Sequence, residues 1–178
     1  ERDPGNRTEE TNLGNLITDA ILWYATKGGE DMGVPAENVV ALTNGGGIRA
    51  TIQAGDITKN DVNTVLPFGN TVAYVIVEGE ALLEALEAST FCSPTAIGGF
   101  LQVSGLTYTI NAGTPSSVTT NDENEFTGVT GDYRVTNVMV GEEPLDVNKT
   151  YTLASHNYML KSGGDGFVMF KNDKLLKD

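Results

Sequence analysis

The chain has 178 residues and a formal net charge of −13, from 24 acidic and 11 basic side chains. Its length suits one ordinary domain with its own core, and its composition of 39% hydrophobic and 20% charged residues excludes wholesale disorder. So acidic a surface repels nucleic acid polymers and anionic membranes, which means that an anionic ligand has to be held by a few local cations.

Cys92 is the single cysteine and His156 the single histidine. One cysteine excludes an intrachain disulfide and a thiolate zinc cluster, and one imidazole excludes a multi-histidine hydrolytic metal centre. We therefore predict no metal site in this chain. We also predict no membrane span, because no apolar run approaches the ~18 residues that a spanning helix needs. A lone histidine at a strand end is more often a hydrogen-bonded structural residue than a catalytic base.

The N-terminal part of the sequence predicts a tail followed by a helix. Residues 1–10 are polar and contain proline and glycine, as in a linker, so we predict a single domain over 11–178. Behind the capping side chain of Thr11, apolar residues recur at helical spacing, which predicts a helix over 12–27 that ends at two glycines. The apolar run that follows predicts a buried strand over 39–43.

Residues 44–49, Asn-Gly-Gly-Gly-Ile-Arg, follow this strand. Glycines let a ligand or a second backbone approach closely, and the amide of Asn44 and the guanidinium of Arg49 suit an anionic or hydroxyl-bearing ligand. A glycine-rich surface turn is the plain alternative. A dinucleotide fingerprint, Gly-x-Gly-x-x-Ala over 45–50, also fits, but it requires a helix to begin within the glycines, and residues 51–56 have no helical period.

The rest of the chain mixes helices and strands without regular alternation. Similar signals predict a capped helix over 58–65, a strand over 71–77, a helix over 80–89, and strands over 101–110, 133–140 and 151–155. We interpret the glutamates of the third helix as a solvated face, and the acidic segment 121–125 as a solvated hairpin tip. This order predicts an α+β or mixed α/β domain, with a mixed sheet and flanking helices, rather than a regular doubly wound fold.

Four blocks of sequence, in chain order, carry a family resemblance. They are residues 7–16 (Arg-Thr-Glu-Glu-Thr-Asn-Leu-Gly-Asn-Leu), 44–49 (Asn-Gly-Gly-Gly-Ile-Arg), 66–70 (Leu-Pro-Phe-Gly-Asn) and 162–167 (Ser-Gly-Gly-Asp-Gly-Phe). Together they resemble the C-terminal, substrate-binding domain of the 5′-nucleotidase family, whose bacterial members include UDP-sugar hydrolases. The resemblance covers nearly the whole chain.

The resemblance implies a substrate-binding role for residues in all four blocks. By position, Arg7 and Arg49 match arginines directed at the substrate phosphate. The glycine loop, with Asn44, Gly46 and Gly47, matches the loop beside the base.

Two further matches complete the implied site. Phe68 matches one of two aromatics that sandwich the base, and Asp165 matches the carboxylate that binds the ribose hydroxyls. The second aromatic is open: the family spacing falls on Met159, whereas a one-residue insertion restores Tyr158, which we prefer because stacking needs a flat ring.

The same resemblance implies what this chain lacks. In the family, an N-terminal calcineurin-like domain carries two divalent metals and the catalytic groups, so this chain alone is expected to hold no cofactor and to be catalytically inactive. The implied function is nucleotide recognition for a phosphohydrolase in nucleotide catabolism, at an extracytoplasmic site (periplasmic, secreted or cell-surface). A stand-alone nucleoside-binding module and a purely structural surface domain are the alternatives.

Overall fold

A computed structural model of the chain describes residues 5–32, 38–171 and 173–177. In chain order the elements are α1 (Asn12–Met32), β1 (Val39–Asn44), the 3-10 turn η2 (Gly45–Gly47), α2 (Lys59–Val65), β2 (Val72–Glu78), α3 (Gly79–Ser89), β3 (Leu101–Ser104), β4 (Leu106–Ile110), β5 (Val118–Thr120), β6 (Phe126–Val129), β7 (Val135–Val140), β8 (Glu143–Pro144), β9 (Thr150–His156), α4 (Asn157–Leu160), the 3-10 turns η3 (Gly164–Gly166) and η4 (Val168–Phe170), and β10 (Lys174–Lys177).

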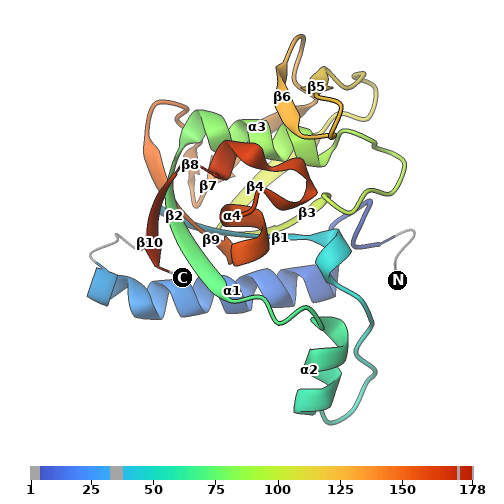
Figure 1. Cartoon of the computed structure of the whole chain (residues 1–178), viewed down its shortest axis with the longest axis vertical. Coiled ribbons are helices and arrows are strands. Elements are labelled where there is room, and N and C mark those ends of the chain that lie inside the picture. Colours follow the sequence, from blue (N-terminus) through green and yellow to red (C-terminus); the bar gives the residue numbers. More distant parts are fainter. Residues whose placement is uncertain (1–4, 33–37, 172, 178) are drawn as a thin grey trace.

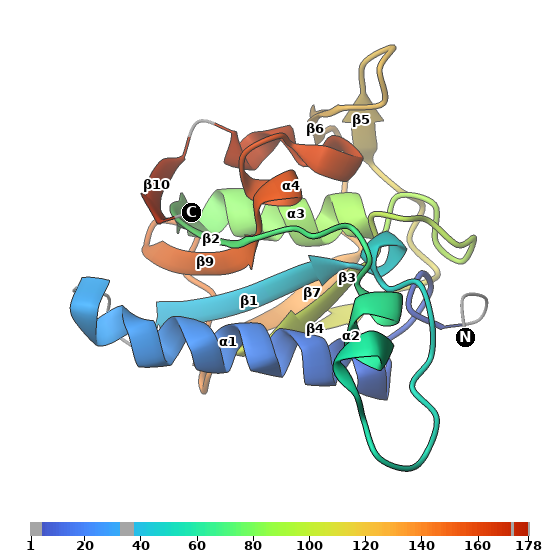
Figure 2. The same cartoon turned by 60° about the horizontal axis from the view of Figure 1, so that its bottom comes forward.

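A five-stranded mixed sheet forms the centre of the fold. Its order is β10-β2-β9-β1-β3, in which β1 and β9 run parallel and the other neighbours run antiparallel. Helix α1 lies along one face, and α3, α4 and the C-terminal segment lie on the other (Figures 1 and 2). A three-stranded sheet, β4-β7-β8, and a β5-β6 hairpin complete the structure. The predicted mixed α/β class with flanking helices is confirmed.

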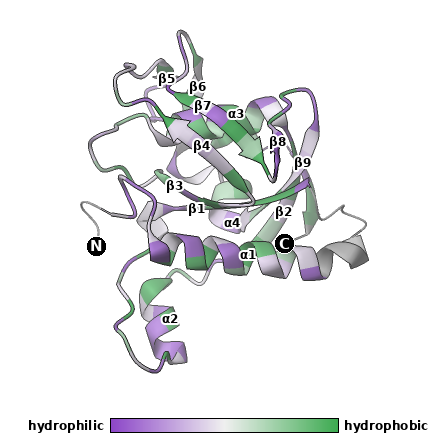
Figure 3. Cartoon of the chain, turned by 180° about the vertical axis from the view of Figure 1, so that it is seen from behind, coloured by the Kyte–Doolittle hydropathy of each residue, from purple (hydrophilic) through white to green (hydrophobic). Residues whose placement is uncertain are grey.

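Side chains along β1 point alternately to the two faces of the sheet and so contribute to two separate core clusters. Val39 and Ala41 pack with α1, whereas Val40 and Leu42 belong to the larger cluster with α3. Successive strand residues point to opposite faces, so a strand buried on both sides has to be apolar throughout. In Figure 3, α1 alternates between hydrophilic and hydrophobic segments along its length, as expected of a helix with one buried face.

Two predicted boundaries are wrong. Helix α1 continues through the two glycines to Met32, because a glycine costs a helix about 1 kcal/mol relative to alanine but does not forbid it. The single strand predicted over 101–110 is two strands, because Gly105 has a φ of +79° and the chain turns there from the five-stranded into the three-stranded sheet. A Cβ at Gly105 would lie 2.8 Å from the Val39 carbonyl oxygen, so the crossing needs glycine.

Residues 5–10, expected as a linker-like tail, are packed against the sheet. The Gln102 side-chain amide donates to the carbonyls of Asn6 and Glu9, at 3.2 and 2.8 Å, and Asn6 is buried. The predicted N-cap is also in place, since the Thr11 hydroxyl accepts from the Gly14 N–H at 3.0 Å. These contacts fix the N-terminal segment beside the end of β1.

Glu87 of α3 does not belong to the solvated face that its spacing predicts. It is fully buried, and its carboxyl group accepts from the backbone N–H groups of Arg134 and Val135, at 3.1 and 2.9 Å. The Arg134 guanidinium in turn donates to the carbonyls of Thr90, Ser93 and Thr114. A buried polar cluster therefore joins α3 to β7 and to the loop before β5.

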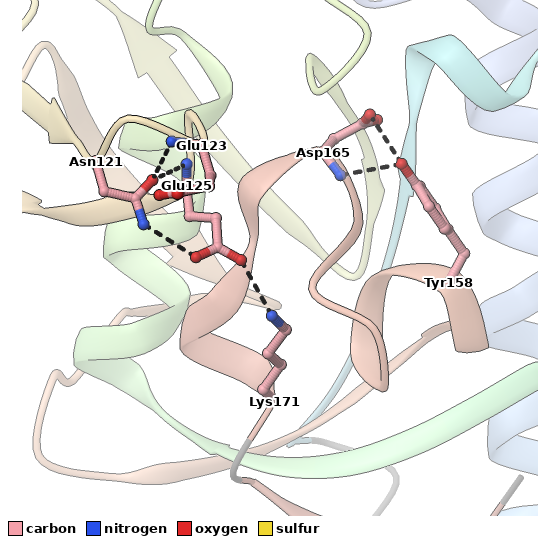
Figure 4. A network of polar contacts seen from close by, with 6 residues as sticks. All are labelled: Asn121, Glu123, Glu125, Tyr158, Asp165 and Lys171. Carbon is pink, nitrogen blue, oxygen red and sulfur yellow. Dashed lines mark hydrogen bonds and ion pairs between the residues drawn. The ribbon is translucent and has the colours of Figure 1, made fainter.

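The β5-β6 hairpin tip is held to the C-terminal segment. Lys171 pairs with Glu125 at 3.2 Å, and the Asn121 amide donates to the other carboxyl oxygen of Glu125 at 3.0 Å (Figure 4). A Cβ at Gly166 would lie 2.8 Å from the Asn124 carbonyl oxygen. The acidic tip of the hairpin thus contacts the turn that carries Asp165. The ion pair between Lys171 and Glu125 is half-exposed, so it adds little to the stability of the fold.

Helix α2 begins at a capping box. The Thr58 hydroxyl accepts from the Asp61 N–H at 3.3 Å, and the Asp61 carboxylate accepts from the Thr58 N–H at 2.8 Å. We expect Thr58→Ala to destabilise this exposed helix by about 1 kcal/mol and to speed amide exchange over 62–66 by about fivefold. Hydrogen exchange followed by NMR measures this. Thr64→Ala in the same helix keeps the cap and should not speed exchange; equal rates in T58A and wild type would contradict the role of the cap.

None of the helices within the described residues is long and apolar enough to cross a membrane.

Candidate functional site

The glycine loop after β1 is a tight 3-10 turn at the edge where several loops meet. The Gly45 and Gly46 N–H groups donate to the carbonyls of Phe100 and Gly98, both at 2.7 Å. A Cβ on Gly45 would lie 1.8 Å from the Asn6 carbonyl oxygen, so this position admits only glycine. No α-helix begins within these glycines, which removes the dinucleotide fingerprint as an interpretation.

Asn44, the last residue of β1, joins two distant segments. Its Nδ2 donates to Oδ2 of Asp165 in a short hydrogen bond, and its Oδ1 lies 2.9 Å from Nε2 of His156. A carboxylate only accepts, so the amide nitrogen has to face Asp165 and the amide oxygen has to face His156. The structure therefore brings together Asn44 and Asp165, which lie 121 positions apart in the sequence.

Asp165 is presented by a turn of unusual backbone geometry. It has a φ of +54°, between Gly163 and Gly166 with φ of +63° and +88°. A non-glycine residue in the left-handed region is strained by about 1 kcal/mol or more, and such strain gathers at functional sites. The side chain is exposed, with the carboxylate turned toward Tyr158 (Figure 4).

Tyr158 and Met159 occupy opposite environments. Met159 is fully buried and its sulfur accepts from the Ser155 hydroxyl at 3.7 Å. Tyr158 is 41% exposed; its hydroxyl donates to Oδ1 of Asp165 at 3.3 Å and accepts from the Asp165 N–H at 3.2 Å. Of the two candidates for a stacking residue, only Tyr158 has a ring at the surface beside Asp165.

Arg49 and Phe68 form a second contact at the same loop. The Arg49 Cζ lies 5.8 Å from the centroid of the Phe68 ring, within the range of a cation–π contact. Nη1 of Arg49 donates to the Gly46 carbonyl at 3.1 Å. Phe68 is 61% exposed as a residue, in a turn between Pro67 and Gly69, whose φ is +65°. An exposed aromatic beside a guanidinium is suited to a planar anionic ligand.

Phe68, Gly47 and His156 line one groove of about 390 Å³. Its other walls are mostly apolar side chains of α1 and α2. Tyr158 and Asp165 are not among its lining residues. Asp165 accepts from Asn44, and the Tyr158 ring stacks on His156. Phe68 and Asp165 therefore do not line the same groove; His156, which lines it beside Phe68, reaches Asp165 through Asn44.

Arg7 lies beside the glycine loop. A Cβ on Gly45 would come 3.2 Å from the Arg7 backbone nitrogen, and the Ile97 N–H donates to the Arg7 carbonyl at 3.2 Å. Its side-chain Nε is buried and has no hydrogen-bond partner among the described residues. Of the eight residues that the resemblance assigns to substrate binding, Asn44, Gly46 and Gly47 lie at the end of β1 and in the turn that follows it. Arg7, Arg49 and Asp165 contact this segment directly, whereas Phe68 contacts Arg49 and Tyr158 contacts Asp165.

Burial lowers the pKa of His156 from 6.5 to about 4, although the nearby Asp165 carboxylate partly opposes this effect. The imidazole is therefore neutral at physiological pH and carries its proton on Nε2. The sequence suggested a structural, hydrogen-bonded histidine, and the hydrogen bond is present. No local signal could have identified Asn44 as its partner, because the pairing depends on β1 and β9 lying side by side.

The described residues contain no group of three or more histidine, cysteine, aspartate or glutamate side chains that could hold a metal ion. Cys92 is a half-buried free thiol.

Comparisons with known proteins agree with this architecture. The family described as 5′-nucleotidase, C-terminal domain, matches residues 2–172. The trifunctional nucleotide phosphoesterase protein YfkN of Bacillus subtilis is 37% identical over 170 residues, which cover 92% of this chain and 10% of that protein. The cell wall protein Lmo0130 of Listeria monocytogenes is 32% identical over 186 residues, with 99% and 21% covered.

Among solved structures, that of a 5′-nucleotidase precursor from Thermus thermophilus has a TM-score of 0.80 and 37% sequence identity. It covers 99% of this chain, and this chain covers 31% of it. The chain therefore spans less than a third of the length of each of these relatives.

Proposed function

Because the chain belongs to the 5′-nucleotidase C-terminal domain family, we propose that it is the nucleotide-recognition domain of a 5′-nucleotidase-type phosphohydrolase. In this proposal Phe68 and Tyr158 hold the base, and Asp165 accepts from the ribose hydroxyls. The observation that carries it is the bonded cluster of Asn44, Asp165 and Tyr158 beside the Arg49–Phe68 contact, at the end of one strand.

The chemistry of these side chains supports a nucleoside as the ligand. Base stacking on an aromatic contributes about 1–3 kcal/mol per base with little selectivity among bases. Selectivity for a ribose would come from Asp165, since a diol offers two further donors to a carboxylate that already accepts from Asn44 and Tyr158, and a ligand without hydroxyls makes neither bond. Arg49 and Arg7 supply local positive charge for a phosphate on a chain whose net charge is −13.

In this proposal, the hydrolytic chemistry belongs to a part of the polypeptide that this chain does not include. A partner domain of the metallophosphatase type would hold two divalent metals, and closure of the two domains would carry the bound nucleotide to them and exclude water. We further propose an extracytoplasmic location, in keeping with the relative named as a cell wall protein.

Titration calorimetry of this chain with adenosine and AMP tests the proposal. We expect measurable binding of both, weakened about tenfold in Phe68→Ala and in Asp165→Asn, because each change removes about 1–2 kcal/mol of contact. Phe91→Ala removes another exposed aromatic, outside the site, and should leave affinity unchanged.

We also expect no AMP hydrolysis by this chain alone with added Mn²⁺ or Zn²⁺. Robust turnover would contradict the division of roles, and absence of nucleoside affinity in the wild type would leave a structural domain as the better interpretation. Binding in a polypeptide that lacks metal-ligand motifs upstream would favour a stand-alone module.

A further inference from the structure

His156 contacts both side chains that hydrogen-bond to the Asp165 carboxylate, Asn44 and Tyr158. On one side its Nε2 bonds to Asn44, whose amide bonds to Asp165. On the other side its ring stacks on Tyr158, with centroids 6.0 Å apart and planes at 24°, and the Tyr158 hydroxyl bonds to Asp165. The four side chains form a closed circuit, in which His156 contacts Asn44 and Tyr158, and these two bond to Asp165.

The direction of each hydrogen bond in the circuit follows from Asp165. Because the carboxylate accepts from Asn44 Nδ2, the Asn44 oxygen must accept, and so the histidine must donate from Nε2. An Asn44 without this donor could rotate its amide by 180°, which would direct an oxygen at the carboxylate and repel it. His156 thus adds a second constraint, besides Asp165 itself, on which group Asn44 presents to the carboxylate.

Stability alone does not explain a histidine at this position. Its Nδ1 is buried and has no hydrogen-bond partner among the described residues. A buried unpaired polar atom is destabilising, and an aromatic hydrocarbon side chain would pack on Tyr158 without that cost. Residues that reduce stability in this way are typical of functional sites.

We propose that His156 is a positioning residue of the ribose site, which acts through Asn44 on Asp165 and through its ring on Tyr158. The proposal rests on the nucleoside-binding function proposed above and adds a residue that the family resemblance did not assign. Because burial keeps the imidazole neutral, it fixes Asn44 without placing a positive charge beside Asp165, whose carboxylate remains available to ribose hydroxyls.

Two variants separate the parts of this role. His156→Phe keeps the aromatic face but loses the donor, and His156→Gln keeps a donor but loses the ring. Ser162→Ala, an exposed change in the neighbouring loop, is the control. The dissociation constants of adenosine and 2′,3′-dideoxyadenosine are measured for each protein by calorimetry, and thermal melting checks that each is folded.

We expect wild type and S162A to prefer adenosine over the dideoxy analogue by about tenfold or more, the value of one charge-assisted hydrogen bond. H156F should lose most of this preference while melting no lower than wild type, and H156Q should retain most of it. A structural role would weaken both ligands equally.

The possible outcomes separate the proposed nucleoside binding from the proposed role of His156. If wild type binds neither nucleoside, the proposed function and the role of His156 are both overturned. If wild type shows the preference and a folded H156F keeps it in full, the role of His156 alone is overturned. A lost preference in both H156F and H156Q, with S162A unchanged, supports positioning through the ring as well as through the donor.

Discussion

Replacing Glu87 by alanine is expected to lower the free energy of unfolding by about 3–5 kcal/mol, a large share of the ~5–15 kcal/mol typical of a domain. The carboxyl group is fully buried and accepts from the backbone N–H groups of Arg134 and Val135. Alanine would leave both donors buried without an acceptor, at about 1–3 kcal/mol each, and would open a cavity between α3 and β7.

Urea denaturation of a short series of variants measures this effect. Glu87→Gln keeps the shape of the side chain and one acceptor oxygen, so its loss should be smaller than that of Glu87→Ala. Glu80→Ala removes an exposed glutamate of the same helix and should change stability by less than about 0.5 kcal/mol. Similar losses in E80A and E87A would show that the buried acceptor is not what matters.

The burial of Glu87 could not be predicted from the sequence of the helix alone. The apolar spacing of α3 predicts the helix correctly, whereas the interpretation of its glutamates as one solvated face is wrong at Glu87. Whether one of them is buried depends on the start of β7 and the residue before it, whose backbone N–H groups, 47 and 48 residues further along the chain, donate to Glu87. The spacing of apolar residues shows which face of a helix is apolar. It does not show which backbone N–H groups, distant in the sequence, need a side-chain acceptor.

The elements that sequence predicted well are those defined by local signals. The capping box of α2 and the apolar run of β1 need only neighbouring residues, and both lie within two residues of their expected bounds. The break at Gly105 had a visible signal, since an isolated glycine inside a strand pattern often marks a turn or a close approach. The packing of residues 5–10 had none, because it depends on the Gln102 side chain of another strand.

In the candidate site, too, some residues have local sequence signals, whereas some contacts depend on the tertiary structure. Composition and spacing select Arg49, Phe68 and Asp165 as unusual residues near glycines, and the family resemblance suggests a role for each. The choice between Tyr158 and Met159 could not be made from spacing, because it depends on how the short helix α4 is rotated: one side chain enters the core and the other faces Asp165. The link from His156 to Asn44 required the parallel pairing of β9 with β1.

Acidification should destabilise the protein through His156, by about 3 kcal/mol between pH 6.5 and 4. The folded state holds the pKa of this imidazole at about 4, mainly because of burial, whereas in the unfolded chain it has its ordinary value of about 6.5. Between these values the unfolded state binds a proton that the folded state does not. The penalty is thus absent well above pH 6.5, grows as the pH falls from 6.5 to 4, and levels off below the folded pKa.

The pH dependence of wild type alone does not isolate this effect, because another group acts in the opposite direction. Burial raises the pKa of Asp173 to about 6, with a smaller effect from Glu78, so this carboxyl group favours folding more as the pH falls. His156→Phe lacks the imidazole but keeps Asp173. The difference in unfolding free energy between wild type and H156F, measured in urea at pH 7, 5.5 and 4, should therefore shift by about 3 kcal/mol against wild type. A difference that stays constant with pH would mean that His156 does not titrate abnormally, and its neutral state in the circuit with Asn44 would lose its support.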